Sequence, residues 1–74
     1  MDTANLIRMA NRIGDFFKAM PERDEALQGI ATHIRKFWEP RMRKDLLAAV
    51  EAGEAGELQE IVLAALQRHR QAIA

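Results

Sequence analysis

Apolar residues recur every three or four positions along most of the chain, the spacing that one face of an α-helix produces. Four such stretches cover nearly all of the sequence, and turn residues separate them. No run of β-branched residues alternates with polar ones, so the pattern offers no strand. The sequence therefore predicts one all-α domain over residues 1–74, a small four-helix domain made of two antiparallel helical hairpins.

The first predicted helix begins at Asp2 or Thr3, whose side chains can cap it, and ends before Pro21. We interpret its apolar stripe, and the methionines in it, as core; the alternative is a groove that binds other molecules. The stripe consists of Leu6, Met9, Ile13, Phe16 and Met20, widened by Ile7, Ala10 and Phe17.

The second predicted helix begins around Pro21, and its stripe is Leu27, Ile30, Ile34 and Phe37. The Glu39-Pro40 pair interrupts it, because proline disfavours the helical conformation of the residue before it. A stop near Trp38 with a restart at Pro40 is the preferred interpretation. A single helix kinked at Pro40, which leaves three helices in all, is the alternative.

The last two predicted helices are separated by "AGEAG" at residues 52–56, where a glycine is the usual left-handed end of a helix. The third has the stripe Met42, Leu46, Leu47 and Val50. The fourth runs from about Glu57, with Leu58, Ile61, Val62, Ala65, Leu66, His69 and Ile73 on one side.

Size and composition limit what such a domain can be. A chain of 74 residues buries only about 60% of the surface of its unfolded form, so a core of this size gives marginal stability. The chain has no cysteine, which excludes disulfides and thiolate chemistry. Its apolar runs are too short for a membrane span or a signal peptide, so we expect a soluble, cytoplasmic protein.

Charge is balanced overall but uneven along the chain. There are eleven basic and eleven acidic residues, and five of the bases lie between Arg35 and Lys44. Five acids and no base follow between Asp45 and Glu60. This balance argues against a dedicated nucleic-acid binder, which usually has a basic domain overall.

The sequence holds few groups that could perform catalysis. Serine and tyrosine are absent, the only hydroxyls are Thr3 and Thr32, and no metal, phosphate-loop or nucleophile motif occurs. His33 and His69 lie far apart in the sequence without metal-ligand spacing, so we interpret them as residues at the core edge or an interface. We expect no catalytic residue, no metal site and no cofactor in this chain.

The stretch "HIRKFWEPRMRKD" at residues 33–45 combines basic and aromatic residues, and it admits three interpretations. In the first, Phe37 and Trp38 complete the core and the arginines are solvated. In the second, Arg41, Arg43 and Lys44 bind nucleic-acid phosphates, which would make the affinity depend strongly on salt. In the third, the stretch docks on another protein, since tryptophan, arginine and methionine are enriched in interfaces.

The amino-acid sequences of two segments resemble those of a known family. "LIRMANRIGDFFKAMP" at residues 6–21 and "GIATHIRKFWEPRMRKDLL" at residues 29–47 resemble the small delta subunit of soluble, NAD-dependent, molybdenum-containing formate dehydrogenases. The resemblance covers about residues 6–56, and "HIRKFWEPRM" is its most specific part.

The resemblance implies a non-catalytic accessory subunit that helps the assembly, cofactor retention or stability of a larger enzyme. Its expected partner is the formate dehydrogenase alpha subunit. The partner subunits are expected to carry bis-molybdopterin guanine dinucleotide, iron–sulfur clusters, FMN and the NAD site. The competing interpretation is a free-standing small helical interaction protein or a nucleic-acid-associated regulator.

We expect the basic and aromatic stretch to bind the partner by protein–protein contact. The alternative is that its cationic residues contact the phosphates of the pterin cofactor. In this hypothesis aromatic side chains anchor the contact, a proline fixes the turn, and arginines pair with acidic groups or carbonyls across the interface. The predicted partner-binding residues are Arg35, Phe37, Trp38, Pro40, Arg41, Met42 and Arg43.

Overall fold

The computed structural model describes residues 2–74, so residue 1 of the predicted domain lies outside the described part. This part is all-helical and contains no strand, which confirms the predicted class. Its helices are α1 (Thr3–Phe17), α2 (Arg23–Phe37), α3 (Pro40–Glu51), α4 (Glu60–Arg68) and α5 (Arg70–Ile73).

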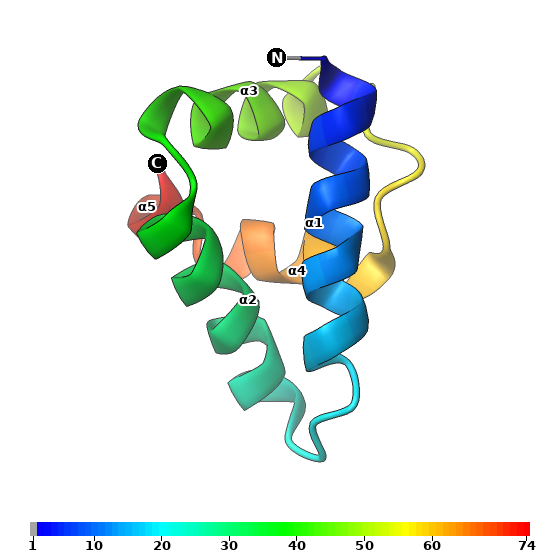
Figure 1. Ribbon diagram of the computed structural model, residues 1–74, viewed down its shortest axis with the longest axis vertical. Helices are drawn as coiled ribbons and strands as arrows, with labels where there is room; N and C mark the ends of the chain where they lie inside the picture. Colours follow the sequence, from blue (N-terminus) through cyan, green and yellow to red (C-terminus); the bar gives the residue numbers. More distant parts are fainter. Residues whose placement is uncertain (1) are drawn as a thin grey trace.

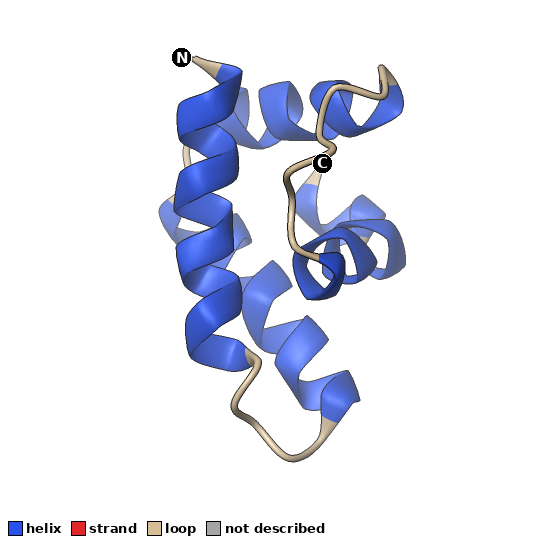
Figure 2. Ribbon diagram, turned by 90° about the vertical axis from the view of Figure 1, so that its right-hand side faces the viewer, coloured by secondary structure: helices blue, strands red, loops and turns tan. Residues whose placement is uncertain are grey.

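Helices α1 and α2 run in opposite directions and form a V, which is closed at its narrow end by the turn at residues 18–22 (Figure 1). α3 lies across the open end and contacts both arms. α4 crosses behind the V and contacts α1 and α2, while α5 packs on α2 and α4 (Figures 1 and 2). One face of the α1–α2 pair is therefore covered by α4, and among the described residues no helix lies over the opposite face.

The predicted arrangement of two hairpins is not confirmed. α1 and α2 pack together as one antiparallel pair, but α3 packs mainly on α1 and α2, and α4 packs on α1, α2 and α5. The connection at residues 52–59 is long enough to carry the chain from the top of the V to its back. Helical periodicity identifies the apolar face of each helix, but it does not identify the helix against which that face packs.

Local signals account for most helix ends. Asp2 caps α1, since the backbone N–H of Ala4 donates to its Oδ1 at 3.3 Å. α3 starts at Pro40, so the predicted stop and restart is confirmed. At its other end Gly53 adopts φ 74°, and its N–H and that of Glu54 donate back to Val50 and Ala49, which makes the expected left-handed cap.

Two predicted boundaries are wrong. α2 begins at Arg23, after Pro21 rather than around it. The last helix starts at Glu60 instead of about Glu57, because residues 57–59 bond to α1: Asn11 donates from Nδ2 to the Glu57 carbonyl at 3.0 Å and accepts the Gln59 N–H at 2.8 Å. The helix is also broken at His69, so that α5 is separate.

The core lies between the V, α3 and α4. Most predicted core residues are buried in it, and Met42 and Val50 pack against its edge. The side chains that are less than 2% exposed are Leu6, Ile30, Ile34, Leu46, Leu66, Ile73 and Val62.

Phe16 and Phe37, in contrast, are 74% and 72% exposed, so their assignment to the core is wrong. The buried face of α1 is formed by Leu6, Ile7, Ala10 and Gly14, so three residues of the predicted stripe are confirmed as core. Met9, Ile13 and Phe17 pack against its edge. Gly14 is the member that the hydrophobic pattern did not show, because glycine has no side chain.

At Gly14, α1 lies very close to the start of α4. A Cβ atom on this residue would lie 2.6 Å from Val62 Cγ2 and 2.7 Å from Gln59 Oε1. The same Gln59 side chain donates from Nε2 to Asp15 Oδ1 at 2.7 Å, and this bond is the main reason why the pKa of Asp15 is lowered. The crossing therefore depends on a missing side chain at one position and on polar contacts at its neighbours.

Replacement of Gly14 by alanine tests this crossing. Although alanine favours a helix by about 1 kcal/mol over glycine, the clash with Val62 should leave a net loss of about 1–3 kcal/mol in the free energy of unfolding. Gly56→Ala is the matched control, because nothing lies within 4 Å of its added Cβ. Urea unfolding followed by circular dichroism measures both, and equal stability of the two variants would contradict the close crossing.

Ion pairs connect the surface of α2 to α4. Arg23 Nη2 lies 2.5 Å from Glu60 Oε2, and Arg68 Nη1 lies 2.6 Å from Asp24 Oδ1. The hydrogen bond from Arg68, followed by its positive charge, lowers the pKa of Asp24 below its ordinary value of 3.8. The side chains of these ion pairs are more than half exposed. Because solvent screens their charges, each pair contributes little to the free energy of unfolding.

The lowered pKa predicts how the Asp24–Arg68 pair responds to acid. Its contribution to the free energy of unfolding should be complete above pH 3.8 and should disappear as the pH falls through the folded-state pKa. Asp24→Asn should therefore be less stable than the unmodified chain at neutral pH, with a difference that vanishes in acid. Urea unfolding between pH 2 and pH 7 measures this, with Glu54→Gln as the control carboxylate. A difference independent of pH would contradict the assignment.

Candidate partner-binding surface

Trp38 lies inside the fold. It is only 6% exposed and belongs to the core cluster. It follows the last residue of α2, and its extended backbone (φ −92°, ψ 140°) turns the chain out of the helix. Of the interpretations that the sequence left open for this residue, the structure supports the core, and it corrects the expectation that the indole is presented to a partner.

Phe37 has the opposite environment, although it is adjacent to Trp38. Its ring is exposed at the end of α2, where α1 and α2 have diverged, and it packs at a tilt against His33, with ring centroids 4.8 Å apart at 45°. The buried indole occupies the core at this end of the V. Phe37 therefore remains available to another molecule.

The first turn of α3 holds the next predicted residues. Glu39 is the N-cap, and Pro40 takes the first helical position, where its missing N–H costs nothing. Arg41 is exposed and Met42 is partly buried against the core. Arg43 turns back toward α2 and donates from Nη1 to the Arg35 carbonyl at 3.2 Å.

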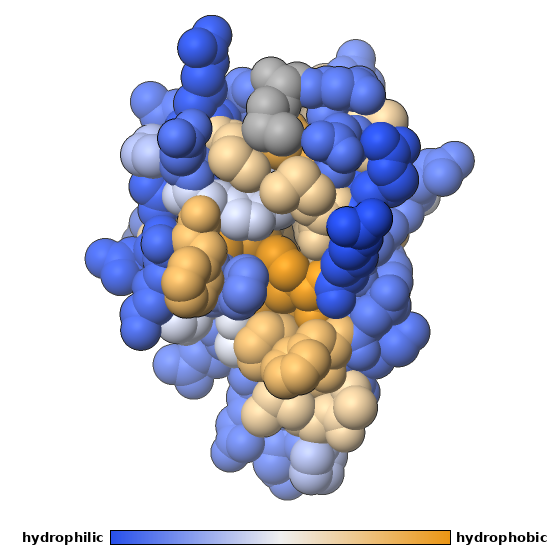
Figure 3. Space-filling view, in the orientation of Figure 1, coloured by the Kyte–Doolittle hydropathy of each residue, from blue (hydrophilic) through white to orange (hydrophobic). Residues whose placement is uncertain are grey.

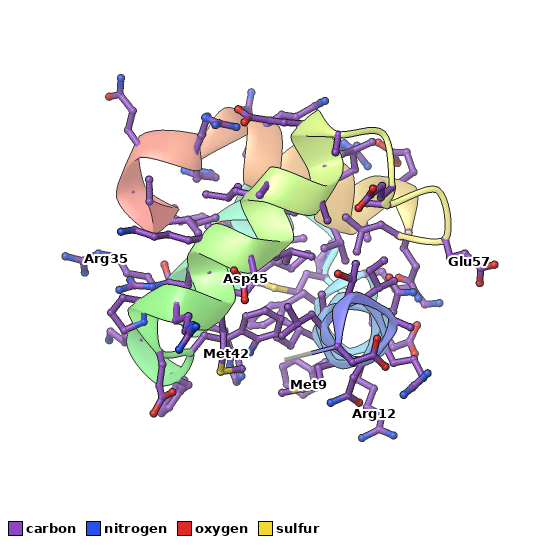
Figure 4. The ribbon with its side chains drawn as sticks, turned by 90° about the horizontal axis from the view of Figure 1, so that it is seen from above. Met9, Arg12, Arg35, Met42, Asp45 and Glu57 are labelled. Carbon is purple, nitrogen blue, oxygen red and sulfur yellow. The ribbon has the colours of Figure 1, made fainter. Side chains whose placement is uncertain are left out.

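These residues do not form one surface. Seen along the long axis, Met42 lies near Met9 and on the same side as Arg12, whereas Arg35 projects from another side of the molecule (Figure 4). Arg35 and Arg43 line a hollow with residues of α5, and Phe37 lines a different one with residues of α1. Closeness in the sequence did not mean closeness on the surface, because successive residues of a helix point about 100° apart.

The aromatic side chains form a groove on the face that α4 leaves uncovered. We call the aromatic groove the surface made by Phe16, Phe17, His33 and Phe37. Phe16 and Phe17 meet edge to face with centroids 5.0 Å apart, and Phe37 stacks on His33. Two adjoining hollows of about 440 and 400 Å³ share Phe17 and His33 as walls, and no residue of α4 lines either.

The space-filling view shows this face directly. Apolar side chains collect over the α1–α2 pair, and hydrophilic side chains surround them (Figure 3). Arg12 and Lys36 line the two hollows as cations, and Glu25 lines one of them as an acid. The aromatic groove is thus an apolar strip with a mostly basic margin.

Gly29 sets the depth of the groove. A Cβ atom at this position would lie 2.4 Å from Phe17 Cε1, so the ring packs against the bare backbone of α2. Phe17 is thereby held half-buried, and Phe16, one residue earlier on the helix, is turned outward. A glycine inside a helical pattern often has a packing reason, so Gly29 is a sequence signal for this close contact, although it does not specify the groove.

Other kinds of site have no counterpart in the described residues. No group of three or more histidine, aspartate or glutamate side chains between residues 2 and 74 is arranged to hold a metal ion. No helix in the same range has the length and apolar character needed to cross a membrane.

A comparison with known protein families identifies the family to which the chain belongs. The model of the family described as NADH-dependent formate dehydrogenase delta subunit, FdsD, matches residues 5–66. The chain belongs to this family. The match contains the whole aromatic groove and all seven predicted partner-binding residues. No curated protein and no solved structure matches the chain.

Trp38 and Phe37 give opposite predictions for this FdsD-family chain. Trp38→Ala should lower the free energy of unfolding by about 3–5 kcal/mol, because it leaves a cavity in a small core. Phe37→Ala should change it by no more than about 0.5 kcal/mol, because the ring is mostly in solvent. Urea unfolding of the isolated chain measures both. A large loss in Phe37→Ala, or none in Trp38→Ala, would contradict the assignments of core and surface.

Proposed function

We propose that this chain is a non-catalytic accessory subunit that binds the molybdenum-bearing large subunit of an NAD-dependent formate dehydrogenase in the cytoplasm. Its contribution is to the assembly, cofactor retention or stability of that subunit. Membership of a family of delta subunits supports an association with other formate dehydrogenase subunits. The choice of the large subunit rests on the resemblance of residues 6–56 to the delta subunits of molybdenum enzymes.

The observation that carries the proposal is the exposure of Phe16 and Phe37. The chain has only four aromatic residues other than histidine, and it leaves two of them in solvent while its core is small. Burying a phenylalanine side chain is worth about 1.5–3 kcal/mol, so an unbound chain forgoes stabilisation at both positions. A partner that covers the groove recovers it, and exposed apolar patches with polar margins are typical of protein interfaces.

The margin of the groove suggests the chemistry of the partner. Arg12 and Lys36 favour a partner surface that places acidic residues around an apolar centre. His33 stacks under Phe37 and adds a polar edge to the apolar floor. Such an arrangement matches the general anatomy of interfaces, in which aromatic anchors are surrounded by a charged rim.

The geometry changes the roles proposed for the predicted binding residues. Phe37 is an anchor together with Phe16, and Met42 and Arg41 extend the contact from α3. Trp38 fills the core behind the corner, and the exposed Pro40 starts α3; neither is an anchor for the partner. Arg35 and Arg43 lie outside the groove. In this proposal the molybdopterin, iron–sulfur, FMN and NAD cofactors belong to partner subunits.

Removal of both aromatic anchors tests the proposal. The double variant Phe16→Ala/Phe37→Ala should bind the large subunit at least about 30-fold more weakly, since truncating an interface hot spot costs about 2 kcal/mol or more. The measurement is co-purification through a tag on the large subunit, followed by titration with the purified chain. Molybdenum content of the recovered enzyme reports cofactor retention.

Gln67→Ala is the matched control, because this exposed residue lies on α4 and not on the groove. It should bind like the unmodified chain. If the double variant stays folded and also binds normally, the groove is not the docking surface. If the unmodified chain itself fails to associate with the large subunit, the proposed function is wrong.

A further inference from the structure

A second hollow lies away from the aromatic groove, between α2, α3 and α5. Its volume is about 610 Å³, and most of the side chains around it are polar or basic. We call it the basic hollow and define it by Arg35, Arg43 and His69. The remaining residues that line it are Gln28, Ala31, Thr32, Gln71, Ala72 and Ala74, so no acidic side chain faces the basic groups.

Neither arginine of the basic hollow forms an ion pair with an acidic side chain among residues 2–74. The same holds for Arg8, Arg12 and Arg41, whereas Arg23, Arg68 and Arg70 each form one. Arg35 and Arg43 differ from the other arginines without an ion pair because both line the same hollow. Two positive charges without an acidic partner therefore lie together at one cavity.

Two nitrogen atoms at this cavity have no hydrogen-bond partner. They are Nε of Arg43 and Nε2 of His69. Both atoms are buried, and neither has a hydrogen-bond partner among residues 2–74. Arg43 uses Nη1 to bond the Arg35 carbonyl, which anchors its guanidinium over the end of α2. A buried polar atom without a partner is costly in a folded protein, and such atoms often indicate a ligand or a rearrangement on binding.

We propose that the basic hollow is a binding site for an oxyanion, a carboxylate or a phosphate group. Arg35 and Arg43 supply charged donors, which bind carboxylate and phosphate with favourable geometry. Arg43 and His69 line the hollow, but their unpaired nitrogens are buried, so both side chains turn toward the anion when it binds. Thr32, Gln28 and Gln71 offer neutral hydrogen bonds to the rest of a polar ligand.

The oxyanion has two possible sources, a free small molecule or an acidic side chain of a partner protein. Both present the same oxygen atoms to the arginines. This proposal does not depend on the docking function of the aromatic groove, because the two surfaces share only the α2 side chains Gln28 and Thr32 at their margins.

Nuclear magnetic resonance titration of the full chain tests the site. Inorganic phosphate and acetate are the probes, each compared with chloride at equal ionic strength. We expect saturable shifts of the amide signals of Thr32, Arg43, His69 and Gln71 with at least one probe. Arg35→Gln and Arg43→Gln should each weaken binding about tenfold, as expected for the loss of one charge-assisted contact.

Arg8→Gln is the matched control, because Arg8 is an exposed arginine of α1 that does not line the hollow. It should bind the probes like the unmodified chain. Arg35 is itself exposed, so its variant reports on binding even if Arg43→Gln unfolds. The proposal would be overturned if neither probe gave a saturable response beyond that of chloride, or if Arg8→Gln and Arg35→Gln lost binding equally.

A titration of the assembled enzyme distinguishes the two sources. If a free anion is the ligand, the probes still bind when the chain is in its complex, and Arg35→Gln assembles normally. If an acidic side chain of a partner is the ligand, the complex no longer responds to the probes and Arg35→Gln weakens assembly. Failure of the double aromatic variant to affect assembly would count against the proposed docking function only.

Discussion

Helix α4 covers only one face of the α1–α2 pair, and most other features of the molecule follow from this. α4 packs closely on α1. Val62 and Gln59 lie against the backbone of Gly14, where a larger side chain would clash with them, and Asn11 forms hydrogen bonds with the segment that leads into α4. Within residues 2–74, no helix lies over the opposite face. The proposal that a partner covers the apolar residues of that face agrees with the needs of small domains, whose own core is often not enough.

The corner between α2 and α3 serves both sides of the molecule. Trp38 fills the core, and its burial directs the neighbouring Phe37 outward to the aromatic groove. Arg43 folds over the end of α2 and joins Arg35 at the basic hollow. One short basic and aromatic segment thus supplies a structural anchor, an apolar contact and a cationic cavity. This division explains why so much cationic and aromatic character lies in a chain without net charge.

Features that depend on local chemistry were predictable from the sequence. The helices, the restart at Pro40 and the glycine cap at Gly53 follow from periodicity and from backbone preferences. The membership of the FdsD family was also evident in the residues. The delayed start of α4 was not predictable, since it depends on Asn11, more than forty positions away. The packing of α4 behind the V has the same long-range origin.

The candidate site was only partly predictable, because a hydrophobic pattern does not distinguish a core face from an uncovered face. Phe16 and Phe37 fit the helical stripes yet lie in solvent, and only Phe37 had been expected to bind a partner. The most direct test of the central claim is a structure of the assembled enzyme by electron cryomicroscopy. The account predicts that both rings are buried against the large subunit, with less than about a tenth of their surface exposed, as for hot-spot residues. Solvent over both rings, with the α4 side facing the partner, would contradict it.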